Sequence, residues 1–244
     1  MSSQAIQNNF LAIYQDLNAA IDGAKFEFPE PVIAAYNPLE YAWDGFEKYV
    51  RKYLRSSVRN VFLGMNPGPW GMAQTGVPFG EVNFVRDWLK LRDIVIRKPI
   101  NELDSYKILG LDCKRSEISG KRLWGLFRDE FAEPENFFAE NFVLNYCPLL
   151  FIARPARNLT PDKIKLPERK ILFGICDDAL RKILEILRPE NAIGIGNFAE
   201  SRLLEVVTSS RVVKILHPSP ASPLSAKNWD VKAKEKLFAS GVWR

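Results

Sequence analysis

Four short apolar runs, spread along the chain, predict the buried strands of a parallel sheet. Each run is rich in Val, Ile, Leu or Phe. None alternates cleanly between apolar and polar positions, as expected where helices cover both faces of a sheet. The four runs are Asn60–Met65, Phe142–Tyr146, Ala192–Ile195 and Val212–Leu216.

Segments with apolar residues at helical spacing lie before and between these runs. One is expected to have Pro167 in its first turn and to end before Pro189. The N-terminal helical stripe consists of Ile6, Phe10, Ile13, Tyr14, Leu17 and Ile21. Further helices are expected over Asp87–Ile96, Leu123–Phe131 and Phe198–Val207.

The alternation of strands and helices predicts an α/β sandwich with a mostly parallel sheet. No linker or internal repeat divides the chain, so we expect one domain over residues 1–244, of which 1–59 form an N-terminal helical part. Ligands bind at the carboxyl ends of the strands in such sheets. The residues found there are Asn66-Pro67-Gly68-Pro69, Asn145, Gly196-Asn197 and His217-Pro218-Ser219-Pro220.

Composition indicates a globular protein and argues against a membrane-spanning one. Hydrophobic residues make up 47% of the 244 residues, which is enough for a large core. The longest near-continuous apolar run, Tyr146–Ala153, is too short to span a bilayer, and no signal peptide is visible, so we expect a cytoplasmic protein that binds no membrane. In a bacterium it would be nucleoid-associated, and in a eukaryote nuclear.

Cysteine and charge content exclude some chemistry and leave other chemistry open. Three separated cysteines and one histidine argue against a disulfide framework, a structural zinc site and a four-cysteine iron–sulfur cluster. The net charge of +5 permits binding to a polyanion, but many soluble proteins without such a partner are equally basic.

A loop dense in glycine and proline follows the first strand, from Gly64 to Glu81. Proline fixes the backbone and glycine allows close approach, so the loop is suited to enclosing a ligand. It is not a phosphate-binding P-loop, because no Gly-Lys-Ser/Thr follows. A purely structural loop is the alternative.

Two polar residues at strand ends are candidates for binding or catalysis. His217 is the only imidazole available to handle a proton or an anion near neutral pH. Asn145 interrupts an apolar stretch, and its amide could either satisfy nearby backbone or read a ligand with a donor and an acceptor. Both residues could instead be structural.

Two further segments have competing interpretations. Gly194–Ala199 matches a loose dinucleotide-binding pattern, but the next strand ends in His217 rather than in an acidic residue, so tight helix–strand packing explains the glycines better. The basic segment Lys114–Trp124 could hold phosphates before a helix start, or it could be a solvated surface.

Taken together, these segments resemble the single-strand-selective monofunctional uracil-DNA glycosylases. The resemblance covers nearly everything from Asn60 onward. Its first motif is Gly64–Pro69 with Gly71–Glu81, and its second is His217–Pro220 with Lys227–Trp229. The segments Ser116–Phe127, Asn145–Leu150, Asn158–Pro161 and Gly174–Asp177 are also similar to family segments.

The resemblance implies a uracil-DNA-glycosylase-like three-layer α/β/α sandwich around a four-stranded sheet. It implies removal of uracil and of some uracils altered at C5 from DNA, by base flipping and water attack, with no metal, no cofactor and no lyase step. Asn66 would hold the water and His217 would contact the base O2. The base pocket would contain Met65, Gly68, Met72, Phe79 and Asn145.

The resemblance also implies a set of DNA contacts, with a monomer bound to single- or double-stranded DNA. The expected contacts are Ser119, Gly120, Lys121, Arg122, Pro218, Ser219, Pro220, Ala221, Ser222 and Leu224. Vertebrate members carry Arg-Asn after the second motif, where this chain has Ala221-Ser222. Either the small Ala221 fills less of the gap left by the flipped base, or Leu224 replaces the wedge. A non-catalytic DNA-binding module, a nucleotide-binding protein and an enzyme for deaminated purines remain alternatives.

Overall fold

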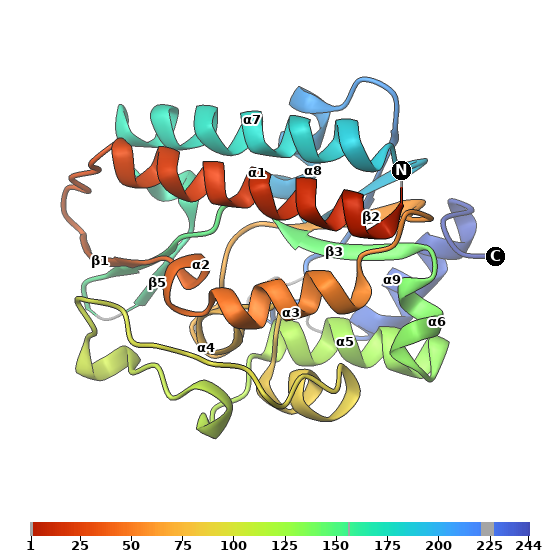
Figure 1. The fold of residues 1–244 in the computed structure, drawn as a ribbon, viewed down its shortest axis with the longest axis horizontal. Helices are drawn as coiled ribbons and strands as arrows, with labels where there is room; N and C mark the ends of the chain where they lie inside the picture. The colour runs from red at the N-terminus through yellow and green to blue at the C-terminus, as the bar shows by residue number, and fades with distance from the viewer. Residues whose placement is uncertain (1, 156, 221–226) are drawn as a thin grey trace.

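A computed structural model describes residues 2–155, 157–220 and 227–244 (Figure 1). Its longer helices are α1 (Ser3–Gly23), α3 (Trp43–Tyr53), α5 (Ile118–Phe131), α7 (Glu168–Leu187), α8 (Asn197–Val206) and α9 (Trp229–Ala239). Short helices are α2 (Pro38–Tyr41), α4 (Met72–Thr75) and α6 (Pro134–Phe138). The strands are β1 (Val32–Tyr36), β2 (Asn60–Gly64), β3 (Asn141–Asn145), β4 (Leu150–Ala153), β5 (Arg157–Leu159), β6 (Asn191–Ile195) and β7 (Arg211–Ile215).

The central sheet contains β2, β3, β6 and β7 in the order β3-β2-β6-β7, and every pairing is parallel. Figure 1 shows α1 and α7 side by side over one face and α3 and α5 on the other. The three-layer α/β/α architecture is therefore confirmed. Each central strand lies within one residue of its predicted limits, because apolar runs mark strands that are buried on both faces.

A second, antiparallel sheet in the order β1-β4-β5 was not expected from the sequence. The N-terminal part of the chain is thus not wholly helical, since β1 pairs with β4 from Tyr36↔Leu150 to Val32↔Ala153. These strands are short, and β4 lies in the apolar stretch that begins at Tyr146. The small sheet holds the segment that follows β3, which carries part of the pocket described below.

The helix predicted over Asp87–Ile96 is wrong. A single wide turn, η1 (Phe84–Trp88), is followed by irregular chain, and Lys90 adopts a left-handed backbone with φ 53°. The hydroxyl of Tyr53 donates a hydrogen bond to the Leu89 carbonyl at 2.6 Å, and Lys52 donates to the same carbonyl. Donors from α3 therefore satisfy backbone groups that a longer helix would have paired.

The helix predicted over Leu123–Phe131 is real but begins earlier, at Ile118. Ser119, Gly120, Lys121 and Arg122 therefore lie at the amino-terminal end of this helix rather than in a loop before it. This places their backbone amides at the positive end of the helix dipole.

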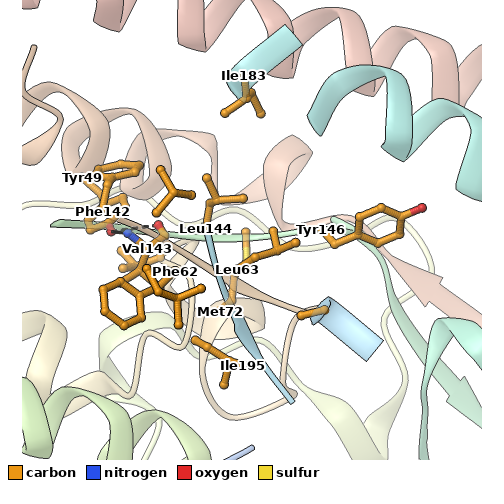
Figure 2. Packing of buried hydrophobic residues seen from close by; sticks show 14 of the residues in the cluster. Tyr49, Phe62, Leu63, Met72, Phe142, Val143, Leu144, Tyr146, Ile183 and Ile195 are labelled. Atoms are coloured by element: carbon orange, nitrogen blue, oxygen red, sulfur yellow. Dashed lines mark hydrogen bonds between the residues drawn. The ribbon is translucent and has the colours of Figure 1, made fainter. Parts of the chain in front are cut away.

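Aromatic and aliphatic side chains from both layers fill the core around the central sheet. Figure 2 shows Phe62, Val143 and Leu144 of the sheet among side chains from several elements, with Ile183 reaching them from α7 and Tyr49 from α3. The Tyr49 hydroxyl donates to the Val143 carbonyl at 3.0 Å, so even the phenol is paired. Within the described part of the chain, no helix is long and apolar enough to cross a bilayer.

Three asparagines cross-link the amino ends of the central strands. Asn60 on β2 lies opposite both Asn141 on β3 and Asn191 on β6. Asn191 Nδ2 donates to Asn60 Oδ1 at 2.8 Å, and Asn60 Nδ2 donates to Asn141 Oδ1 at 3.1 Å. All three side chains are buried. We call this set the asparagine ladder. It fixes strand register at the end of the sheet opposite the pocket.

Candidate active site

A pocket of about 290 Å³ lies at the carboxyl ends of the central strands. This volume is close to the lower limit of the about 300–1,000 Å³ typical of small-molecule sites. Of the predicted site residues, those in its lining are Met65, Asn66, Gly68, Phe79, Ser119, His217 and Ser219. The lining also includes four residues for which the sequence predicted no role, namely Pro67, Glu117, Asn158 and Thr160.

Phe79 presents its ring to the pocket from a constrained backbone. Its φ is 55°, a left-handed conformation that a bulky residue rarely adopts. The Phe79 carbonyl accepts hydrogen bonds from Trp124 Nε1 at 3.1 Å and from the Glu81 amide at 2.7 Å. Gly120 packs so closely that a Cβ there would lie 2.0 Å from this carbonyl. The surrounding contacts therefore hold the ring in place.

Asn145 ends β3 beside this ring, and its side chain is buried. Among the described residues, its Nδ2 donates only to Met72 Sδ, at 3.3 Å, and a thioether sulfur is a weak acceptor. Its Oδ1 has no hydrogen-bond partner among the described residues. A buried, unpaired amide oxygen is costly, and it would be satisfied by a ligand that donates a hydrogen bond.

Gly64 makes room for this arrangement. A Cβ at that position would lie 2.3 Å from Asn145 Oδ1 and 2.4 Å from Phe79 Cε2. Gly64 belongs to the glycine- and proline-rich motif singled out from the sequence, but its role depends on a contact with β3 that spacing cannot show. Met72 contacts the Asn145 amide through its sulfur, and neither residue is among those that line the pocket.

His217 follows β7 and lines the same pocket, with its ring centroid 6.2 Å from that of Phe79. Its Nδ1 accepts a hydrogen bond from the Ser219 amide at 3.1 Å, so the neutral ring carries its proton on Nε2. Burial lowers the pKa of His217 to about 4. The imidazole is therefore neutral near pH 7, and Nε2–H remains as a donor for a ligand.

Asn66 is oriented by backbone carbonyls. Its Nδ2 donates to the Leu149 carbonyl at 3.1 Å, just before β4, and to the Pro67 carbonyl at 3.5 Å. With the amide nitrogen engaged, Oδ1 is the atom left to accept a hydrogen bond. The small antiparallel sheet thus helps to position a polar group in the pocket.

Glu117 adds a carboxyl group that the sequence reasoning missed. Its Oε2 accepts a hydrogen bond from the Trp70 amide at 3.3 Å, and burial raises the pKa of the carboxyl. The sequence offered one indication of its importance, because Glu117 is the single acidic residue in the basic segment Lys114–Trp124. The fold brings it against the loop that follows β2, 47 residues away in sequence.

The predicted DNA-binding residues lie in different surroundings. Arg122 Nη1 donates to the Pro218 carbonyl at 3.1 Å, which ties α5 to the loop after β7. Lys121 and Arg122 also line a second groove with Asn228 and Trp229. Gly120 is buried against Phe79, and Pro220 is exposed. Ala221, Ser222 and Leu224 lie outside the described residues.

The glycines of the dinucleotide-like segment are accounted for by packing. A Cβ on Gly194 would lie 2.5 Å from the Glu200 amide of α8, and one on Gly196 would lie 3.0 Å from His217 Cβ. Gly196 has φ 93°. These residues let α8 and His217 approach β6. Within residues 2–155, 157–220 and 227–244, no group of three or more His, Cys, Asp and Glu could hold a metal ion.

Comparison with known proteins places this geometry in context. Residues 51–238 match the family model described as the uracil DNA glycosylase superfamily. The chain is 43% identical to the single-strand selective monofunctional uracil-DNA glycosylase of Rattus norvegicus, over 98% of this chain and 87% of the relative. The Bos taurus protein of that name is also 43% identical, over 99% and 89%.

A solved structure supports the fold. The crystal structure of wild-type Pedobacter heparinus SMUG2 superposes with a TM-score of 0.65 and covers 88% of this chain and 90% of its own. Sequence identity in this pair is only 19%, so the likeness concerns the fold alone.

Proposed function

The chain belongs to the uracil DNA glycosylase superfamily, among the single-strand selective monofunctional uracil-DNA glycosylases, and on this basis we propose that it removes uracil from DNA and leaves an abasic site. The observation that carries this proposal is the buried, unpaired Oδ1 of Asn145 beside the Phe79 ring. The proposed range includes related deaminated or oxidised bases.

Base recognition follows from the orientation of Asn145. The target nucleotide leaves the stack and its base enters the pocket, where Phe79 stacks on one face. Oδ1 accepts from N3–H of uracil, and Nδ2 donates to O4. Cytosine has an acceptor at N3 and a donor on C4. The acceptor Oδ1 would then face another acceptor, and the donor Nδ2 would face another donor. That mismatch is the source of selectivity.

Bond cleavage places negative charge on the base and positive charge on the sugar. His217 donates Nε2–H to the base O2 as that charge develops. A donor aimed at developing charge in a site that excludes water contributes about 3–4 kcal/mol. Because the low pKa of His217 keeps the ring neutral, it stabilises the leaving base by hydrogen bonding and not as a cation.

Asn66 holds the attacking water through Oδ1. A neutral amide is a poor base, but an oxocarbenium-like sugar accepts a weak nucleophile, so positioning is enough. We propose direct water attack with no metal and no lyase step. On the DNA side, Lys121 and Arg122 contact phosphates, and the loop from Pro218 onward enters the space left by the flipped base.

The test is base release from matched oligonucleotides carrying uracil, hypoxanthine, xanthine or cytosine, in EDTA, under single-turnover conditions. We expect uracil release with cytosine untouched. Replacing Asn66 or His217 with alanine should slow uracil release at least tenfold. If the wild-type protein binds these oligonucleotides but releases no base, the chain is a binding module and the proposal is wrong.

A further inference from the structure

A stack of three flat side chains lies outside the base pocket, and the proposed function gives it no role. Tyr106 and Trp70 are nearly parallel, with ring centroids 5.5 Å apart and an interplanar angle of 10°. The Arg115 guanidinium lies over the Trp70 ring, with its Cζ 3.6 Å from the ring centroid. The quadrupole of the indole attracts a cation over its face, so Trp70 holds the guanidinium against the stack.

The stack lies beside the mouth of the pocket. Pro67 and Gly68, shortly before Trp70, line the pocket, and so does Glu117, two residues after Arg115. The Trp70 amide donates to Glu117 Oε2 at 3.3 Å, which joins the two segments directly. A DNA strand that delivers a base to this pocket therefore passes near the stack.

A buried side chain aligns the two rings of the stack. Gln74 is fully buried, and its Nε2 donates to the Pro69 carbonyl at 3.0 Å and to the Lys107 carbonyl at 3.1 Å. Pro69 directly precedes Trp70, and Lys107 directly follows Tyr106. One amide group therefore fixes the backbone next to both rings.

The Arg115 guanidinium is exposed and held in place before any ligand binds. Its backbone is anchored, since the Ser116 hydroxyl donates to Oε1 of the buried Glu81 at 2.8 Å. In the described part of the chain, no carboxylate pairs with Arg115 and no acceptor takes a hydrogen bond from it. The planar fork of donors at its edge matches the oxygens of a phosphate, and an ordered side chain loses little entropy on binding.

We propose that Arg115, held by Trp70, is a clamp for a phosphate of the DNA backbone beside the flipped nucleotide. Trp70 is a positioning residue, because it acts through Arg115. The ligand is a phosphodiester, since the contact uses the edge of the guanidinium and no base. The clamp therefore adds affinity for DNA and not choice of base. This inference rests on the proposed function, because it takes DNA as the ligand.

The experiment measures binding to a single-stranded oligonucleotide that carries 2′-fluoro-2′-deoxyuridine, in which the fluorine opposes positive charge on the sugar and so prevents base release. We expect Arg115→Gln to weaken affinity about tenfold, as for one charge-assisted hydrogen-bonded contact. The slope of log affinity against log salt should fall by about 0.7, as for one phosphate of a single strand.

Arg188→Gln is the matched control. Arg188 is exposed after the carboxyl end of α7, close to the amino end of β6 and away from the pocket. This variant should change neither the affinity nor the slope. Equal affinity and slope in Arg115→Gln and the wild-type protein would show that Arg115 makes no phosphate contact, and the inference would be wrong.

A double-mutant cycle tests the role of Trp70. Trp70→Leu should weaken affinity, and the double variant with Arg115→Gln should bind no more weakly than Arg115→Gln alone, because the indole acts only through the guanidinium. Trp70→Phe retains a ring and should keep most of the affinity. Additive losses would show two separate effects, including a damaged loop, and would overturn the clamp.

Phosphate replacement separates this inference from the proposed function. A neutral methylphosphonate is placed at one phosphate at a time, within about three nucleotides of the modified uridine. One position should weaken binding by the wild-type protein much more than binding by Arg115→Gln, and the absence of such a position overturns the inference. Uracil release from an ordinary oligonucleotide is measured in parallel. If the wild-type protein releases no uracil but binds DNA through Arg115, the proposed function alone is overturned.

Discussion

At the scale of single residues, Gly64 is a position where one added methyl group should disturb two groups of the site at once. In Gly64→Ala, the new Cβ would meet Asn145 Oδ1 and the Phe79 ring. We expect single-turnover uracil release to slow at least tenfold, because base recognition needs both groups in place. The measurement is the release rate, with urea unfolding of the same sample.

Gly174 provides the matched control for this change. It is exposed within α7, and a Cβ there would have no neighbour within 4 Å. Gly174→Ala should leave the rate unchanged and stabilise the protein by up to about 1 kcal/mol. A normal rate in Gly64→Ala would mean that the pocket does not bind a base as proposed.

His217 predicts a dependence of stability on pH. Its pKa is lowered from 6.5 to about 4 in the folded protein, so below pH 6.5 the unfolded chain takes up a proton that the folded protein does not. The contribution of the neutral His217 to the free energy of unfolding is therefore fully present above pH 6.5, and it is lost as the pH falls towards 4. The loss should reach about 3 kcal/mol, to order of magnitude.

The control for this prediction is His217→Asn, which cannot titrate. Urea unfolding at pH 7 and at pH 4.5 should show a smaller loss for the variant than for the wild-type protein, because carboxyl groups titrate equally in both. Equal losses would show that the imidazole is not held neutral by burial.

At the scale of secondary-structure elements, the amino-terminal end of α5 both supports the pocket and carries cations for the proposed DNA interface. Gly120 packs on the backbone of Phe79, while Lys121 is exposed and Arg122 holds the Pro218 carbonyl. We expect Lys121→Ala to reduce the slope of log affinity against log salt by about 1, as for one lost phosphate contact. The measurement is DNA binding at several salt concentrations.

Arg122→Ala should differ from Lys121→Ala. It should also slow uracil release, because Arg122 holds the residue next to His217. Lys170→Ala is the charge-matched control, since Lys170 is exposed on α7, which covers the other face of the sheet (Figure 1). An unchanged slope of log affinity against log salt in Lys121→Ala would show that Lys121 makes no phosphate contact.

Breaking the asparagine ladder should lower the free energy of unfolding without changing the rate of base release. Asn60→Ala would leave Asn141 Oδ1 and Asn191 Nδ2 without their partner. The free energy of unfolding should fall by about 2–6 kcal/mol, since each of the two unpaired buried groups costs about 1–3 kcal/mol. The rate per folded molecule should not change. A comparably large rate loss would contradict the separation of the two ends of the sheet.

Arg59→Ala is the neighbouring control for the ladder. Arg59 precedes Asn60 and pairs with Glu140 and Glu190 at the surface. Exposed ion pairs contribute little, so this variant should lose much less stability than Asn60→Ala. Urea unfolding of both variants makes the comparison.

Sequence patterns predicted those elements whose residues carry the pattern within the element itself. The central strands were predicted because their apolar runs are buried on both faces. The antiparallel sheet was missed, because β1 and β5 are short and depend on pairing with β4. The helix over Asp87–Ile96 was wrong, because Lys52 and Tyr53 on another element satisfy the carbonyls there.

At the scale of the whole molecule, the site joins segments that are far apart in sequence. Asn66, Phe79, Asn145 and His217 were candidates because they follow strands or belong to a long motif. Glu117 and Gly64 were not assigned roles, because their importance depends on contacts with Gly68 and Asn145 that only the folded chain brings together. Sequence patterns thus singled out several residues that the fold brings together around one pocket, and contacts such as those of Glu117 and Gly64 appear only in the folded chain.

The asparagine ladder and the pocket occupy opposite ends of the same five-residue strands. A strand of this length spans roughly 17 Å, so a substitution at one end has no direct contact with the other. Additivity of mutational effects is the rule at such separations. Laboratory evolution of base preference could therefore alter the loops around the pocket while a reinforced ladder compensates for their cost in folding stability.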